Sequence, residues 1–247
     1  MMDRLGAEEL QKRLRETAAE DLSKLVGSHL EELDPISLRQ LFRNPHLNRQ
    51  VIEILLGDRR LLAFHEIRKE LARHPQTPEV RALRFVSGLF WRDLVELTAD
   101  NRVRPRVRRA AERHLVDRIP GLGTGEKVAI ARRAGPLLVS QLRHDNEPRV
   151  IAALLENPRL TEGGLVPLVS SETAKPEILA MLARHPKWGI RYPIRVSLAR
   201  NRRTPVQTTL SLLPLLRKQD LKGIEQDRRL NVAVRRRAAV LLGRPPP

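Results

Sequence analysis

The chain of 247 residues contains no cysteine. This absence excludes disulfides, zinc sites with thiolate ligands, cysteine nucleophiles and iron–sulfur clusters held by cysteine. Aromatic residues make up only 3%, which argues against aromatic platforms for stacking bases and against an all-β fold. No apolar run approaches the roughly 18 residues that a membrane span needs, and the N-terminus lacks the apolar core of a signal peptide. We therefore expect a cytoplasmic protein without a membrane span.

Acidic residues are scarce relative to basic ones, 29 against 46, so the formal net charge is +17. The excess is uneven, with a net charge of −1 over residues 1–60, +7 over residues 61–150 and +11 over residues 151–247. A strongly basic surface favours nucleic acid, an acidic protein or an anionic membrane surface as partner. Arginine outnumbers lysine 38 to 8, as GC-rich coding sequence also tends to produce. That bias does not explain the shortage of acids after residue 150.

Apolar residues recur at helical spacing along most of the chain, and strand patterns are nearly absent. The opening segment, residues 6–33, is typical of one or two amphipathic helices. Asp34 and Pro35 then predict a new helix, with Asp34 as its N-cap and Pro35 at its first position. We predict an all-α fold with about ten to twelve helices, a count that rests on this spacing.

A polar corner recurs where the predicted helices end. Proline ends a helix and restricts the residue before it, while Asn or His can hydrogen-bond the frayed helix end. A threonine follows several corners and predicts the N-cap of the next helix, at Thr77, Thr161 and Thr204. The corners are Arg43-Asn44-Pro45, Arg73-His74-Pro75, Glu156-Asn157-Pro158, Arg184-His185-Pro186 and Arg200-Asn201-Arg202, with weaker versions at Asn101 and Asn146.

These corners, each followed by an apolar helix, resemble bacterial HEAT-like and leucine-rich-variant repeats over residues 35–242. The resemblance implies a right-handed α-solenoid with a binding role and brings no catalytic residues. Some leucine-rich-variant proteins hold an iron–sulfur cluster on cysteines, which this chain lacks. We expect an N-terminal helical cap at residues 1–34, repeat halves at residues 35–120 and 121–242, and a disordered tail at residues 243–247.

A glycine-rich segment from Gly121 to Lys127 superficially resembles a phosphate-binding loop. That motif needs glycine before the lysine and Ser or Thr after it, whereas Glu126 and Val128 occupy these places. We interpret the segment as a turn between the halves, with Thr124 capping the next helix. The seven histidines show no metal-ligand spacing, and His74 and His185 stand where other corners have asparagine, which indicates local hydrogen bonding. No cofactor and no metal site are expected.

An enzyme alternative rests on two tryptophans and one carboxylate. HEAT-like alkylpurine DNA glycosylases combine a basic concave surface with tryptophans and a carboxylate that act on the damaged nucleotide. Trp91, Asp93 and Trp188 could form such a set. In the simpler interpretation, Trp91 belongs to the core and Trp188 covers a helix end. Neither a nucleophile elbow nor a protein-kinase motif is present, so the primary prediction is a protein without enzymatic activity.

Clustered arginines carry the strongest functional signal. Arg106, Arg109 and Arg113 fall on one side of a helix predicted to begin at Pro105, apart from an apolar stripe that includes Val107. If the repeats stack, such clusters could join into a strip that contacts phosphates without reading bases. The alternative is a set of solvated faces partly paired with acids. The predicted polyanion-binding residues are Arg102, Arg104, Arg106, Arg109, Arg113, Arg184, Lys187, Arg191, Arg195, Arg202, Arg203, Arg235 and Arg236.

Three functions follow from these patterns. The first is a noncatalytic helical-repeat scaffold that binds another protein or a protein complex, or a polyanion, through its basic surface. The second is a solenoid that binds DNA or structured RNA without sequence specificity. The third is the glycosylase. The sequence leaves the identity of the partner and the oligomeric state open.

Overall fold

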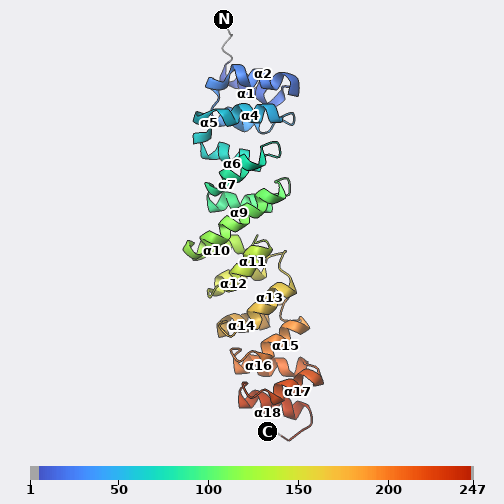
Figure 1. Cartoon of the computed structure of the whole chain (residues 1–247). Coiled ribbons are helices and arrows are strands. Elements are labelled where there is room, and N and C mark those ends of the chain that lie inside the picture. The colour runs from blue at the N-terminus through green and yellow to red at the C-terminus, as the bar shows by residue number, and fades with distance from the viewer. Residues whose placement is uncertain (1–5, 246–247) are drawn as a thin grey trace. The chain divides into compact units, whose positions relative to one another are not determined.

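A computed structural model describes residues 6–245, and within this range the chain forms eighteen α-helices, three short 3-10 helices and no strand (Figure 1). The predicted all-α fold is confirmed. The predicted number of helices is too low, because single apolar stretches hold two short helices. One such stretch is divided at Asp58 into helices of nine and five residues. Within the described range, none of the helices is both long and apolar enough to cross a membrane.

The chain divides into two compact units, Met1–Arg118 (unit 1) and Ile119–Pro247 (unit 2). Unit 1 contains α1 (Ala7–Glu16), α2 (Ala19–Ser28), η1 (Leu30–Glu32), α3 (Pro35–Leu41), α4 (Arg49–Gly57), α5 (Arg59–Ala63), α6 (His65–Arg73), α7 (Glu79–Ser87), α8 (Trp91–Ala99) and α9 (Pro105–Arg118). Unit 2 contains η2 (Ile119–Gly121), α10 (Thr124–Ala131), α11 (Pro136–Leu142), α12 (Pro148–Leu155), α13 (Glu162–Val169), α14 (Pro176–Arg184), α15 (Tyr192–Arg200), α16 (Val206–Leu212), η3 (Leu213–Leu215), α17 (Lys218–Gln226) and α18 (Val232–Leu241). The predicted cap and repeat halves remain predictions. The predicted tail includes residues 246–247, which lie outside the described residues.

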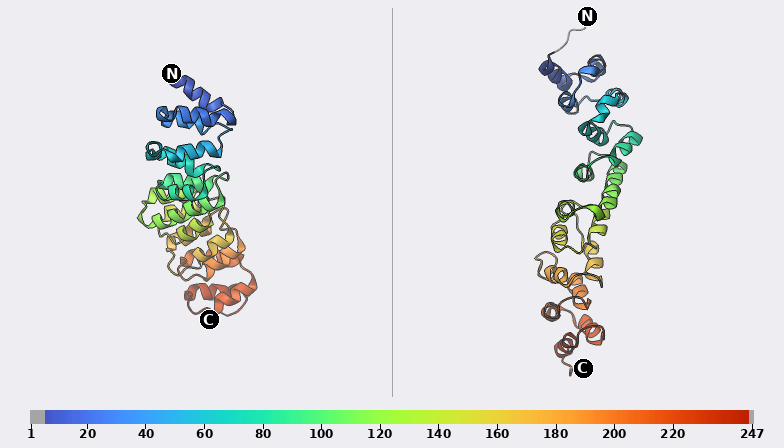
Figure 2. Two further views of the ribbon diagram at one scale, coloured as in Figure 1. Left: turned by 45° about the horizontal axis from the view of Figure 1, so that its top comes forward. Right: turned by 90° about the vertical axis from the view of Figure 1, so that its left-hand side faces the viewer.

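Helices within each unit follow one another in chain order (Figure 2) and pack against helices close in sequence. In unit 1, one core joins α1 to α6 and includes Leu14, Leu38 and Leu71, all fully buried. In unit 2, a core around Leu213 and Ile224 joins α15 to α18. Burying each such side chain contributes roughly 1.5–3 kcal/mol, so this apolar burial holds the short helices together.

Two predicted helix starts are confirmed. Asp34 caps α3 by accepting a hydrogen bond from the Ser37 amide at 2.7 Å, and Ser37 Oγ accepts one from the Asp34 amide at 2.9 Å. The hydrogen bond from the Ser37 amide holds the pKa of Asp34 below its ordinary value. Thr161 caps α13, with its Oγ1 accepting from the Gly164 amide at 3.2 Å. Both caps satisfy main-chain donors that would otherwise lack partners.

The other predicted threonine caps are wrong. Pro78 holds the N-cap position of α7, so Thr77 lies one residue too early, and Thr77 is fully buried. Thr204 likewise precedes Pro205, and its hydroxyl donates back to the Leu198 carbonyl at 2.7 Å. Thr124 is the first residue of α10 and follows the cap, Gly123. In the first two cases the proline sets the helix start; the Thr204 hydroxyl serves the preceding turn, whereas the buried Thr77 hydroxyl has no hydrogen-bond partner within the described residues.

The two units repeat one order of helices at a constant offset of 127 residues. The helices α3, α4, α6, α7, α8 and α9 begin at residues 35, 49, 65, 79, 91 and 105, and α13 to α18 begin at residues 162, 176, 192, 206, 218 and 232. The sequence supports this correspondence with Thr-Pro at 77–78 and 204–205, and with Leu-Ala-Arg at 71–73 and 198–200, although Leu-Ala-Arg also occurs at 182–184. A feature found in both units at this offset therefore belongs to the repeated framework.

Candidate functional site

Buried asparagines tie the end of one helix to an earlier helix end. Asn157 is fully buried, and its Nδ2 donates to the carbonyls of Ala131 at 2.8 Å and Ala134 at 3.0 Å. Its Oδ1 accepts from the Arg159 amide at 2.8 Å. The last carbonyls of a helix have no donor within the helix, so this side chain supplies one from the next corner.

The corner histidines have the hydrogen-bonding role that the sequence predicts. His74 Nδ1 accepts from the Gln76 amide at 3.2 Å, and His185 Nδ1 accepts from the Lys187 amide at 3.2 Å. Burial lowers the pKa of His74, which favours its neutral form. Across residues 6–245, no group of His, Asp or Glu side chains could hold a metal ion.

The two weaker corners are held by aspartates rather than by the predicted Asn101 and Asn146. Asp100 Oδ1 accepts from the Arg102 amide at 2.9 Å, and Asp145 Oδ1 accepts from the Glu147 amide at 2.9 Å. The prediction is therefore wrong by one residue at each corner. The reason is that the acceptor must stand two residues before the amide that it binds, and a carboxylate does this as well as an asparagine carbonyl.

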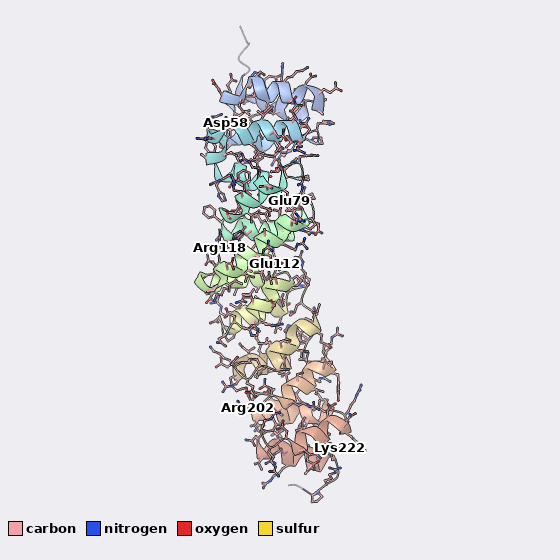
Figure 3. The ribbon with its side chains drawn as sticks, in the orientation of Figure 1. Asp58, Glu79, Glu112, Arg118, Arg202 and Lys222 are labelled. Atoms are coloured by element: carbon pink, nitrogen blue, oxygen red, sulfur yellow. The ribbon has the colours of Figure 1, made fainter. Side chains whose placement is uncertain are left out.

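Several arginines serve the same helix-capping purpose. Arg60 Nη1 donates to the Leu33 carbonyl at 2.8 Å, and Arg118 Nη1 donates to the Leu89 carbonyl at 2.6 Å. Figure 3 shows Asp58 and Arg118 on one edge of unit 1 and Glu79 on the opposite edge. Arginine near a helix C-terminus complements the exposed carbonyls, so part of the basic excess has a structural use within the fold.

Five members of the predicted polyanion-binding set are engaged within the fold. Arg104 donates to the Pro75 carbonyl, and Arg195 Nε donates to the Gly189 carbonyl at 2.8 Å. The other three form ion pairs, namely Arg102 with Asp100 at 3.0 Å, Arg106 with Glu79 at 2.9 Å and Arg202 with Glu172 at 2.9 Å. Figure 3 labels Arg202 and Glu79. These contacts lower the number of guanidiniums ready for a ligand.

Five other members of the set have guanidiniums without a hydrogen bond or ion pair within the described residues. In unit 1, α9 begins at Pro105 as predicted, and Arg109 and Arg113 are exposed one turn apart on it. Within residues 6–245, their guanidiniums make no hydrogen bond or ion pair, and the same holds for Arg184, Arg191 and Arg203 in unit 2. The Lys187 ammonium lies 4.4 Å from the ring centroid of Trp188, and Arg235 is half-buried while Arg236 is exposed. A single continuous strip remains a prediction.

Each unit carries a groove at a corner. The unit 1 groove has a volume of about 660 Å³, and the unit 2 groove has a volume of about 290 Å³. The unit 1 groove is lined by Pro35, Arg39, Phe42, Arg43, Glu66, Ile67, Glu70, Arg73, His74, Pro75 and Arg102. The unit 2 groove is lined by Ser170, Glu172, Val196, Ser197, Arg200, Asn201, Arg202 and Arg229.

The two grooves occupy equivalent positions in the repeated framework. At the offset of 127 residues, Arg73 corresponds to Arg200 and Arg102 to Arg229, so each groove has an arginine at both places. The remaining matched lining positions are Arg43 and Ser170, Glu70 and Ser197, His74 and Asn201, and Pro75 and Arg202. A concave, arginine-lined surface thus recurs where the fold recurs.

Aspartates fix the arginines at the rims of both grooves. In unit 1, the Asp100 carboxylate forms ion pairs with Arg102 Nη2 at 3.0 Å and with Arg73 Nε at 2.6 Å. In unit 2, the Asp227 carboxylate forms an ion pair with Arg229 Nη2 at 2.8 Å. The hydrogen bonds from Arg102 and Arg73 hold the pKa of Asp100 well below its ordinary range, and the bond from Arg229 lowers the pKa of Asp227. Both aspartates therefore stay ionised and orient their arginines.

The carboxylate of the predicted glycosylase set lies within a helix–helix tie. Asp93 is 8% exposed, and its carboxylate contacts His65 Nε2 at 2.7 Å and Lys69 Nζ at 3.0 Å. Burial raises the pKa of Asp93, but the bonds from His65 and Lys69 outweigh this and keep it low. Its equivalent, Asp220, accepts a hydrogen bond from the Tyr192 hydroxyl at 2.6 Å. The same tie between equivalent helices in both units indicates a structural role.

The two tryptophans differ in their surroundings. Trp188 is buried, and its Nε1 donates to the Leu155 carbonyl at 2.9 Å at the end of α12. This confirms that Trp188 covers a helix end. Trp91 is only half-buried and has the Arg92 guanidinium 5.2 Å from its ring centroid. The predicted core position of Trp91 is therefore correct only in part.

Sequence reasoning missed most of the groove. Arg39 and Arg43 are four residues apart, as are Glu66 and Glu70, and this spacing places each pair on one helix face. That spacing was the available signal, together with the repeated Leu-Ala-Arg that contains Arg73. What the sequence could not provide is that α3 and α6 lie next to each other.

Comparisons with known proteins identify no relative. No family model, no curated protein and no solved structure matches this chain.

Proposed function

We propose that this chain is a noncatalytic binding scaffold that holds an acidic segment of a partner protein in its arginine-lined grooves. In this proposal the helices form a right-handed α-solenoid of HEAT-like repeats, and the protein works in the cytoplasm. The observation that carries the proposal is the recurrence of an arginine-lined groove at equivalent corners of both units. Concave surfaces with a few fixed charged groups are the common form of binding sites.

The lining favours a protein segment over nucleic acid. The unit 1 groove places Glu66 and Glu70 beside its arginines, and the unit 2 groove includes Glu172. Carboxylates repel a phosphate backbone, whereas a polypeptide can offer complementary groups to both signs of charge. Phe42 adds apolar surface that an inserted side chain can cover. These features support a peptide ligand.

Nucleic acid is the second candidate, and exposed arginines on α9 favour it. Arg109 and Arg113 lie one turn apart, outside both grooves, with their guanidiniums unpaired within the described residues. Together with Arg106, they would contact phosphates and make binding depend on salt concentration. This surface is distinct from the grooves, so the two functions can be separated by substitution.

Two matched double variants separate these functions. R39E/R43E and R109E/R113E change the net charge by the same amount. Both pairs lie in unit 1, and all four arginines are exposed and unpaired within the described residues. We expect R39E/R43E to lose capture of the partner protein from a nuclease-treated lysate of the source organism, and R109E/R113E to retain it. Circular dichroism of both variants checks the fold.

The same proteins are titrated with mixed-sequence duplex DNA and RNA at low salt. If R109E/R113E loses affinity at least about tenfold and flattens the salt dependence, while R39E/R43E does not, the function is nucleic-acid binding. The scaffold proposal fails if both variants capture the same proteins as the wild type. Measurable nucleic-acid binding that neither variant changes would exclude both surfaces.

A further inference from the structure

The unit 1 groove has two charged walls of opposite sign. Arg39 and Arg43 come from α3 and its corner, and Glu66 and Glu70 come from α6. The two helices are in contact, yet within residues 6–245 none of these four side chains forms an ion pair or a side-chain hydrogen bond. The charges that α3 and α6 bring to this groove are therefore not bridged directly to each other.

The floor between these walls is apolar. Ile67 is 2% exposed, and Phe42 is half-buried, packs against the core of unit 1 and lies 6.3 Å from the ring of His74. The volume of about 660 Å³ lies within the range of about 300–1,000 Å³ typical of ligand sites. The groove therefore has room for at least one large apolar side chain with polar groups on either side.

We infer that the unit 1 groove binds a segment of a partner protein that carries an apolar anchor residue between an acidic side and a basic side. The anchor covers the exposed part of Phe42, the acidic side chains face Arg39 and Arg43, and the basic side chains face Glu66. This arrangement gives Arg39, Arg43 and Glu66 each a partner of opposite charge, which is the pattern of electrostatic complementarity at protein interfaces. The inference rests on the proposed function and specifies the ligand of this groove.

The unit 2 groove lacks these opposed walls. Val166 and Ser170 stand in place of Arg39 and Arg43, and Pro193 and Ser197 stand in place of Glu66 and Glu70. The groove is also less than half as large. The framework is repeated, but the four unpaired charges on α3, its corner and α6 are not, so the inferred selectivity belongs to unit 1 alone.

The inference is tested by changing the sign of one wall at a time in the full chain. A displayed library of random 12-residue peptides is selected against the wild type, E66K/E70K and R39E/R43E. We expect wild-type peptides to combine acidic and basic residues around an apolar one. E66K/E70K, with two basic walls, should enrich acidic peptides, and R39E/R43E, with two acidic walls, should enrich basic ones.

Synthetic peptides from each pool then provide the quantitative result. By fluorescence anisotropy, each protein should bind its own peptide at least about tenfold more tightly than it binds peptides of the other two pools. E20K/E31K makes the same charge change at exposed, unpaired glutamates of unit 1 outside the groove, and it should select the same peptides as the wild type. A new preference in each variant also shows that its fold is intact.

Three outcomes would overturn the inference. In the first, the peptides selected by the three proteins have the same charge composition. In the second, E20K/E31K shifts the selected peptides as much as E66K/E70K does. In the third, no peptide is enriched. In each case the proposed function is decided separately by partner capture with R39E/R43E. If capture also survives in that variant, the proposed function fails with it. If capture is lost, the grooves bind a partner whose chemistry differs from the one inferred here.

Discussion

Buried asparagines are the residues on which the helix ends depend most directly. Asn44, Asn157 and Asn201 each donate twice to carbonyls 23–32 residues earlier and accept one amide two residues later. Three of the four hydrogen-bonding positions of each side-chain amide are thereby used. An apolar residue of similar size would remove all of these hydrogen bonds to main-chain groups, so the identity of the residue matters more than its volume.

Removing one of these amides should destabilise the protein strongly. In Asn157→Ala, two carbonyls and one amide in a buried corner lose their hydrogen bonds to the side chain, and we expect the free energy of unfolding to fall by roughly 2–4 kcal/mol. The control is Asn231→Ala, which removes an exposed cap of α18 and should cost about 1 kcal/mol. Urea unfolding followed by circular dichroism gives both values. Equal losses of unfolding free energy in the two variants would show that burial of the corner contributes nothing to stability.

His74 should make stability depend on pH. Burial lowers its pKa in the folded protein, whereas the unfolded chain takes up a proton near pH 6.5. The unfolded state therefore binds more protons as the pH falls below about 6.5, and stability declines until the folded pKa is passed. His74→Asn should remove this decline, because asparagine occupies the equivalent corner at Asn201.

Melting temperatures of the wild type and the variant between pH 7.5 and 5 measure this effect. His46→Asn changes an exposed histidine of the same unit and serves as the control. A wild-type pH dependence that is retained in His74→Asn would assign the effect to another group.

At the scale of elements, the connection from α14 to α15 leaves no room for a side chain at Gly189. A Cβ on Gly189 would overlap the main-chain carbonyl of Ala183 and lie 2.9 Å from that of His185. The Gly189 amide also donates to the His185 carbonyl at 2.8 Å. Both neighbours are main-chain atoms, so a side chain here can be accommodated only by moving the backbone of the turn.

Gly189→Ala should therefore destabilise the protein by roughly 1–3 kcal/mol through overpacking. Gly163 lies within α13 with nothing near its Cβ position, and Gly163→Ala should stabilise by about 0.5–1 kcal/mol because alanine favours the helix. Differential scanning calorimetry of the two variants should show shifts of opposite sign. A shift of the same sign in both would contradict the role assigned to Gly189.

Much of the element pattern could be predicted from the sequence. The cap at Asp34, the start of α9 at Pro105 and the helix-ending corners follow from local chemistry, which nearby residues determine. The positions of Thr77 and Thr204 could not be predicted, because the buried site of each threonine depends on packing. The groove was missed for the same reason, since Arg39 and Glu66 meet only after α3 and α6 have packed.

At the scale of the whole molecule, the repeated framework should give equivalent substitutions similar effects. Asp100 and Asp227 both have lowered pKa values because arginines donate to them. Each therefore contributes stability above the unfolded pKa near 3.9, and this contribution is lost as the pH falls below about 4. Asp100→Asn and Asp227→Asn should each reduce the melting temperature at pH 7, and this reduction should shrink as the pH falls from about 4 toward the lower folded pKa of each aspartate.

The comparison of the two variants tests the equivalence itself. Asp117→Asn, an exposed aspartate of unit 1, should leave the melting temperature at pH 7 nearly unchanged. If Asp100→Asn acts and Asp227→Asn does not, the correspondence at an offset of 127 residues does not extend to the energetics.

The net charge of +17 does not describe one uniform basic surface. Arg60 and Arg118 cap helix ends, Arg102 and Arg229 are held by aspartates, and other arginines remain exposed. Composition alone could not separate these uses, because each depends on a contact 2 to 31 residues away. The charge excess therefore indicates an anionic partner less directly than the two grooves do.

The ties between corners have a direction. Asn44, Asn157 and Asn201, like Arg60 and Arg118, all donate to carbonyls that come earlier in the chain. Since a ribosome delivers the N-terminal part first, each newly made corner can close the helix end that emerged before it. The fold can thus be completed stepwise during synthesis. Each helix end gains its hydrogen-bond donor only after about 30 further residues have been synthesised.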